Sequence, residues 1–166
     1  TALGSYAIAD GDVSVAVGQS SYAATKSVAV GLQANATTDS SLAVGNASKA
    51  NSMYGMTIGN FANSTGVGAI TVGNAANGAG SPISNGAGAI AIGGFVNSAA
   101  RGASAGTATT AADYAIAVGN ASVAASESAI AIGKGAQATA TQAISIGTGN
   151  VVSGANAGAI GDPSYV

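Results

Sequence analysis

The sequence lacks cysteine and histidine, and it is poor in charged and aromatic residues. None of its 166 residues is Cys, His or Trp, and charged residues make up only 6% of the chain, against about 25% in an ordinary domain. Without cysteine, disulfides and thiolate metal sites are excluded. Without histidine, the string Gly102-Ala103-Ser104-Ala105-Gly106 lacks the base that a serine nucleophile requires. We therefore predict that the protein is not an enzyme.

Further absences narrow the range of partners. The four basic residues are scattered singly and form no run that could bind nucleic acid; they are Lys26, Lys49, Arg101 and Lys134. No stretch of about 18 apolar residues is present that could cross a membrane as a helix. Asp10 and Asp12 flank Gly11, but no acid recurs at that spacing, so the pair predicts a solvated turn and not a calcium site. We expect neither a metal nor a cofactor.

The sequence does contain a repeat that ends on glycine. A large, a small and a large apolar residue precede the glycine, as in Val28-Ala29-Val30-Gly31 and Ile130-Ala131-Ile132-Gly133. Weaker copies end at Gly4 and Gly161. Seven of the ten intervals between successive glycines are 14 residues long, one is 13, and two are longer. The structural glycines of the clear copies are Gly18, Gly31, Gly45, Gly59, Gly73, Gly93, Gly119, Gly133 and Gly147.

The alternation within each repeat has a period of two, which indicates β-structure. A second alternation follows the glycine, with small residues three and five positions later, as Ala34 and Ala36 follow Gly31. A 14-residue period thus accommodates two short strands and two tight turns. We predict an all-β solenoid of about eleven coils, each about 4.8 Å from the next.

The strand before each glycine has no charged residue on either face, so we expect it to be covered on both sides. Its own second strand covers one side, and association with identical chains is the simplest cover for the other. Because packed sheets normally lie about 10 Å apart, we place Val and Ile inside the coil, although the reverse orientation remains open. The predicted partner-facing residues are then Ala16, Ala29, Ala43, Thr57, Thr71, Ala91, Ala117, Ala131 and Ser145.

The motifs Ser27-Val28-Ala29-Val30-Gly31, Ser41-Leu42-Ala43-Val44-Gly45 and Ser128-Ala129-Ile130-Ala131-Ile132-Gly133 resemble the YadA-like head repeats of trimeric autotransporter adhesins. The resemblance covers nearly the whole chain. It implies a left-handed parallel β-roll, assembled as a homotrimer and displayed on the outer surface of a Gram-negative bacterium. Residues 1–166 are interpreted as a single head segment without the family's neck, stalk or membrane anchor, so any membrane contact would depend on an anchor outside this sequence.

Two long intervals predict loop insertions, near residues 79–87 and 99–113. Loops on a rigid scaffold often carry recognition, but these have few aromatic or charged anchors. The interpretation we favour is therefore that they are tolerated extensions with no partner, and a third possibility is that they cross to a neighbouring chain and lock it. Four of the five tyrosines, Tyr6, Tyr22, Tyr54 and Tyr114, are not at one repeat position and are interpreted as rim packing. The candidate recognition residues are Ser81, Pro82, Ser84, Asn85, Arg101, Ser104, Thr107 and Asp113.

These observations favour an adhesive head that attaches by avidity to a host extracellular-matrix or cell-surface protein. The alternative is a structural spacer, with adhesion located elsewhere in the parent protein. An ice-binding solenoid would need a regular array of exposed threonines, and threonine occupies the centre of the signature only at Thr57 and Thr71. Binding of the isolated segment to matrix proteins would separate the first two hypotheses.

Overall fold

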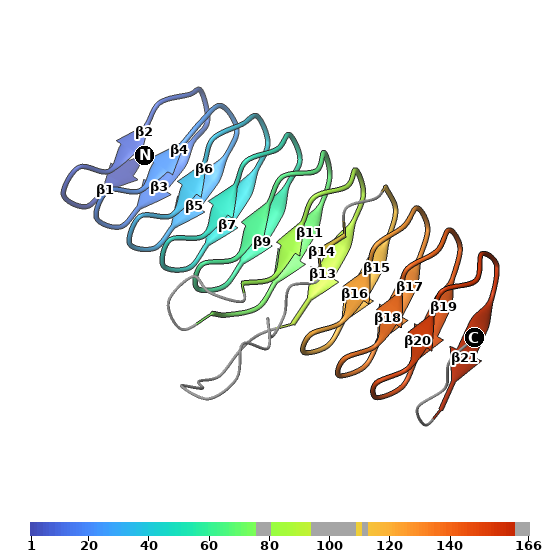
Figure 1. Cartoon of the computed structure of the whole chain (residues 1–166). Helices are drawn as coiled ribbons and strands as arrows, with labels where there is room; N and C mark the ends of the chain where they lie inside the picture. Colours follow the sequence, from blue (N-terminus) through green and yellow to red (C-terminus); the bar gives the residue numbers. More distant parts are fainter. Residues whose placement is uncertain (76–80, 94–108, 111–112, 162–166) are drawn as a thin grey trace.

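The chain folds as a β-solenoid in which two layers of short strands wind along one axis (Figure 1). The computed structural model describes residues 1–75, 81–93, 109–110 and 113–161. Within these ranges all regular structure is β, and no helix long and apolar enough to cross a membrane is present. The predicted all-β solenoid is therefore confirmed.

The first layer is a parallel sheet of eleven strands, one from each repeat, and each strand pairs with its equivalent in the next coil. Ala29, for example, lies opposite Ala43, which lies opposite Thr57. The strands are β1 (Ala2–Leu3), β3 (Val15–Val17), β5 (Val28–Val30), β7 (Leu42–Val44), β9 (Met56–Ile58), β11 (Ile70–Val72), β13 (Ile90–Ile92), β15 (Ile116–Val118), β17 (Ile130–Ile132), β19 (Ile144–Ile146) and β21 (Gly158–Ile160). We call this layer the large sheet.

The second layer consists of two-residue strands and is divided into a seven-stranded and a three-stranded parallel sheet. The division falls between β14 and β16, just after the longer insertion, which lies between β13 and β14. The first sheet contains β2 (Ile8–Ala9), β4 (Tyr22–Ala23), β6 (Asn35–Ala36), β8 (Lys49–Ala50), β10 (Asn63–Ser64), β12 (Ile83–Ser84) and β14 (Thr109–Thr110); the second contains β16 (Val123–Ala124), β18 (Gln137–Ala138) and β20 (Val151–Val152). We call this layer the small sheets.

The eleven strands of the large sheet are joined by about ten complete turns, one fewer than the number of glycine-closed repeats. At about 4.8 Å between paired strands, the solenoid is roughly 50 Å long. Its two chain ends therefore lie at opposite ends of the rod (Figure 1).

The interior of the coil is filled by small side chains. Ala29, Ala43 and Ala131 in the large sheet are fully buried, as are Ala36 and Ala138 in the small sheets. The predicted orientation of the large sheet is therefore wrong: each residue predicted to face a partner chain points into its own coil. Those residues, with exposed fractions of 0%, are Ala16, Ala29, Ala43, Thr57, Thr71, Ala91, Ala117, Ala131 and Ser145.

The error came from applying the spacing of ordinary packed sheets to a much smaller coil. Strands of three and two residues are linked here by short turns on both sides. Alanine, serine and threonine therefore point inward from both layers, and the layers approach more closely than sheets with interdigitating large side chains. In the large sheet the Val, Leu and Ile side chains are therefore on the outer face, whereas Val152 of β20 is a buried exception in the small sheets.

The signature glycines lie where successive coils come into closest contact. Gly119 has a φ of 131°, and a Cβ atom added there would lie 2.6 Å from the carbonyl oxygen of Gly133. Such a φ strains any residue with a side chain, and the carbonyl belongs to the backbone and cannot swing away. The glycine thus sets both the turn and the contact with the next coil.

Both insertions enter the solenoid on the same side. Ten positions separate Gly73 from Ile83, whereas four separate Gly59 from Asn63. Similarly, sixteen positions separate Gly93 from Thr109. After the short strand the normal spacing returns, since seven positions join Ile83 to Ile90 and Thr109 to Ile116. In the sequence, each insertion thus falls between a signature glycine and the next short strand. We call the edge of the rod that follows the signature glycines the glycine edge.

Candidate interaction surfaces

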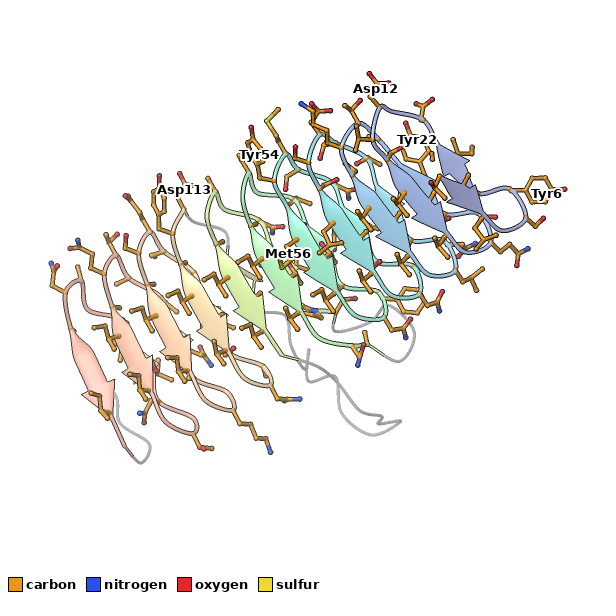
Figure 2. All side chains as sticks on the ribbon, turned by 180° about the vertical axis from the view of Figure 1, so that it is seen from behind. Tyr6, Asp12, Tyr22, Tyr54, Met56 and Asp113 are labelled. Carbon is orange, nitrogen blue, oxygen red and sulfur yellow. The ribbon has the colours of Figure 1, made fainter. Side chains whose placement is uncertain are left out.

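The outer face of the large sheet is an apolar surface that runs along the rod. Each internal strand places two large apolar side chains outward, on either side of its buried central residue. Met56 and Ile58 are 37% and 38% exposed, and Ile132 is 37% exposed. Met56 projects near the middle of this row of strands (Figure 2). A contiguous apolar face of this length is a typical association surface.

The outer face of the small sheets is polar over its first half. Thr37 donates to Oδ1 of Asn51 at 3.3 Å, and Nδ2 of Asn51 donates to Oδ1 of Asn63, also at 3.3 Å. Near the first coil the Tyr22 hydroxyl donates to Asp10 at 2.8 Å. This hydrogen bond to a carboxylate raises the pKa of Tyr22 above its ordinary value. The Thr37–Asn51 bond joins equivalent positions of successive coils, whereas the other two bonds are offset by two residues from the strand register.

A shallow hollow of about 230 Å³ lies on this polar face beside the first insertion. It combines the ammonium group of Lys49, the ring of Phe61 and the amide of Asn63 with smaller apolar groups. Its lining residues are Ala47, Lys49, Phe61, Asn63, Ser81 and Ile83. The hollow brings together residues from three successive coils, β8, β10 and β12.

The edge of the rod opposite the glycine edge collects the acidic residues. All five acids of the described ranges lie in the turns that follow short strands: Asp10, Asp12, Asp39, Asp113 and Glu127. We call this side the acidic edge; Asp12, Tyr54 and Asp113 mark it in Figure 2. Within the described ranges, no three acidic or other ligating side chains gather closely enough to hold a metal ion.

Two of the tyrosines lie at equivalent positions on the acidic edge. Tyr54 and Tyr114 share the same left-handed backbone conformation, each with a φ of 59°. Tyr6 lies on the glycine edge, and Tyr22 lies on β4. The four tyrosines thus do not share one repeat position, as the sequence predicts, although Tyr54 and Tyr114 do. The six extra residues before Ile83 and the twelve before Thr109 shift the numbering and hide the match.

The predicted recognition residues do not form one site. Ser81 and Pro82 are buried, and Ser84 points into the coil, where it donates to the carbonyl of Ile70 at 2.8 Å. Asn85 is exposed and accepts a hydrogen bond from Thr65 at 2.7 Å. Asp113 is exposed in an ordinary turn of the acidic edge and not in an inserted loop. The remaining candidates, Arg101, Ser104 and Thr107, lie outside the described residues.

The sequence comparison agrees with the repeat that the structure displays. Residues 1–21, 23–48 and 111–136 match the family model described as the YadA head domain repeat, in two copies. The matched segments lie on both sides of the two insertions and include β3, β5, β7 and β15. The comparison with curated proteins found no match.

Proposed function

The chain is a YadA-like head domain of the trimeric autotransporter adhesins, and from this premise we propose that it is the surface-exposed adhesive head of a homotrimer. In this proposal the coils wind left-handed, three chains pack about one axis, and the assembly attaches to a host extracellular-matrix or cell-surface protein. The parent protein would be exported and held at the bacterial outer membrane by an anchor. A solenoid head of this family is non-enzymatic in kind.

The apolar outer face of the large sheet is the observation that carries the proposed assembly. Its two outward columns contain only apolar residues from β3 to β19, and several of them remain more than one third exposed in a single chain. Burying such a surface stabilises association by about 25 cal/mol for each Å² of apolar area removed from water. The face that we propose to line the trimer is thus formed by Val, Leu, Met and Ile and not by alanine.

Copies of the same chain are the partner whose geometry fits this face. The outward side chains recur with the coil spacing along the rod. A second copy presents apolar side chains with the same spacing, so all its coils can pack at once. Three copies, in a closed ring, would cover the face on every chain and leave the small sheets and the acidic edge available for ligands.

The solution mass of residues 1–166 tests the assembly. We expect three times the chain mass of 15.3 kDa in light scattering. Placing lysines at both outward positions of one strand, Ile130→Lys with Ile132→Lys, should convert the trimer to monomer. Gln137→Lys, on the outer face of β18, serves as the matched control and should leave the mass unchanged. If the unsubstituted chain is monomeric, or if the double-lysine variant is still trimeric, this packing is rejected.

Attachment itself needs a separate measurement. Collagen, laminin and fibronectin, each immobilised at several densities, would be exposed to the trimer, and we expect binding that strengthens steeply with density because three copies bind together. The structural spacer is the competing function, and the low charge and regular repetition of the coils favour it. Trimer that binds none of the proteins, nor host cells, at any density would support the spacer.

A further inference from the structure

Two tyrosines and two glycines occupy one column on the acidic edge. The backbone ladder sets the alignment: the amide of Gly68 donates to Met53 at 2.9 Å, that of Gly88 to Val67 at 2.8 Å, and that of Tyr114 to Ala87 at 2.8 Å. Tyr54, Gly68, Gly88 and Tyr114 therefore lie in four successive turns. With about 4.8 Å per turn, the two tyrosines are about 14 Å apart along the rod.

The two glycines leave space between the tyrosines. A Cβ atom on Gly68 would meet nothing within 4 Å, whereas one on Gly88 would lie 3.1 Å from the ring of Tyr114. The Tyr114 ring thus lies over Gly88, and the position above Gly68, one turn nearer Tyr54, is open. Tyr54 and Tyr114 are 63% and 64% exposed, and Val67 is 56% exposed. We call this surface the tyrosine patch; it comprises Met53, Tyr54, Val67, Gly68, Gly88 and Tyr114.

Exposed acids flank the tyrosine patch at both ends. Asp39 lies one turn before Met53, and Asp113 lies one turn after Ala87, followed by Glu127. The Asp113 carboxylate is held in place because its Oδ1 accepts a hydrogen bond from the amide of Ala87 at 2.9 Å. Lys26, the basic residue of this edge, lies two turns from Tyr54, beyond Asp39. The patch is therefore apolar at its centre and negative at both ends.

We propose that the tyrosine patch binds an extended peptide that has an apolar centre and basic residues about six positions apart. The proposal rests on the adhesive function above and names the chemistry of one partner. Asp39 and Asp113 are four turns apart, or about 19 Å, and an extended peptide advances about 3.3 Å per residue. Arginine suits both ends, since it pairs with carboxylates through two hydrogen bonds and packs against tyrosine faces.

The charge on this edge decides between partner classes. An acidic or strongly anionic ligand would be repelled by Asp39, Asp113 and Glu127, and a neutral apolar peptide would leave these acids without a partner. The basic ends of the proposed peptide complement them, while its centre covers Val67 and Met53, which are otherwise 56% and 45% exposed. Because the ion pairs are exposed, their contribution should fall as salt rises.

Fluorescence anisotropy with the full 166-residue chain tests the proposal. The probe is a dye-labelled nine-residue peptide with arginine at its second and eighth positions and Val, Pro and Leu between them. A matched peptide carries glutamate at both positions. We expect the arginine peptide to bind at least about tenfold more tightly than the glutamate peptide, with a preference that weakens in high salt.

Gly68→Tyr is the sharpest variant, because it fills the open position. Gly68 has a φ of 66°, close to the 59° of Tyr54 and Tyr114 in the same column. We expect about a tenfold loss of peptide affinity, as at an interface anchor, and a melting temperature lowered by only a few degrees by the strain of a left-handed φ. Gln142→Tyr is the control, because Gln142 occupies the same column with a φ of 56°, two turns beyond Tyr114.

A second variant isolates the charge. Asp113→Asn keeps the acceptor for the amide of Ala87 and removes the negative charge. It should therefore lower the affinity for the arginine peptide and also make that affinity less dependent on salt. Equal binding of the two peptides, no binding of either, or full binding by Gly68→Tyr would overturn the proposal. If these results occur while the trimer still binds a matrix protein, the peptide site is rejected and the adhesive function stands; loss of matrix binding as well would reject both.

Discussion

Two stretches of the rod fill the same interior positions with different chemistry. From Ala16 to Ala50 the inward-facing residue of every strand is alanine, and the buried serines lie in the turns. From Thr57 to Ser84 it contains hydroxyl groups that bond to one another: Thr57 lies 2.8 Å from the Ser64 hydroxyl, and Thr71 donates to Ser84 at 3.0 Å. The strand register continues unchanged between the two stretches, with Ala43 opposite Thr57.

The difference shows that the coil restricts the volume of its interior side chains more strictly than their polarity. A hydroxyl is tolerated because a partner lies within bonding distance, often a carbonyl oxygen, such as that of Lys49 for Thr57 at 3.1 Å. Without that partner, the buried hydroxyl would destabilise the fold. Substitutions at inward and outward positions separate the volume limit from the polarity limit.

Ala43→Leu should have the largest effect, because the alanine-filled coil has no space for three more carbon atoms. We expect a loss of about 3 kcal/mol in the free energy of unfolding, measured in urea at fixed protein concentration. Val44→Leu adds bulk at the neighbouring, outward position and should change stability by less than about 1 kcal/mol. Equal losses from the two variants would contradict the assignment of the coil interior.

Thr57→Val keeps the shape of the side chain and removes its hydroxyl. It should destabilise the protein by about 1–3 kcal/mol, because the Ser64 hydroxyl and the Lys49 carbonyl each lose a buried partner. The same urea measurement applies. A neutral or stabilising result would show that the hydroxyls do not depend on one another.

Adding Ser64→Ala to Thr57→Val should recover part of that loss. The second substitution removes the polar group that the first leaves unpaired, so the two effects should couple by about 1 kcal/mol in a double-mutant cycle. Combining Ala43→Gly with Ser64→Ala provides a cycle between residues that share no hydrogen bond, and additive effects are expected there. Additivity in both cycles would refute the hydroxyl pair.

Asn51→Ala should have the smallest effect. Asn51 is exposed, and its two side-chain hydrogen bonds, to Thr37 and Asn63, are both 3.3 Å long. Exposed ladders of this kind change stability by less than about 0.5 kcal/mol. A loss as large as that of Thr57→Val would mean that the outer ladder, and not the interior, stabilises the central coils.

The sequence is sufficient to predict the strands, the glycine positions and the parallel stacking. The spacing of Gly31, Gly45 and Gly59 specifies the coil, because a side chain at any of these positions would collide with the next backbone. The family resemblance rests on the same residues. The position of each insertion within its turn does not follow from spacing alone, since a long interval gives the number of extra residues and not their place.

The sequence does not determine which face of the large sheet points inward, for a physical reason. Alternation shows that Ala29 and Val30 point in opposite directions, but a strand without charged residues does not indicate which direction is inward. The acidic edge was also missed, although it could have been found by writing the turns in columns of 14 with the insertions removed. Asp39, Met53, Val67, Ala87 and Asp113 then fall into one column.

The direction of the backbone hydrogen bonds has a mechanical consequence. In a parallel solenoid these bonds run along the rod, so a pull on its two ends loads only the few bonds that join neighbouring coils. Under such tension a single chain would open one coil at a time. Each coil would lengthen from about 4.8 Å to about 46 Å, given about 3.3 Å for each of its 14 residues. The head could then act as an extensible tether that absorbs strain between two surfaces before it detaches.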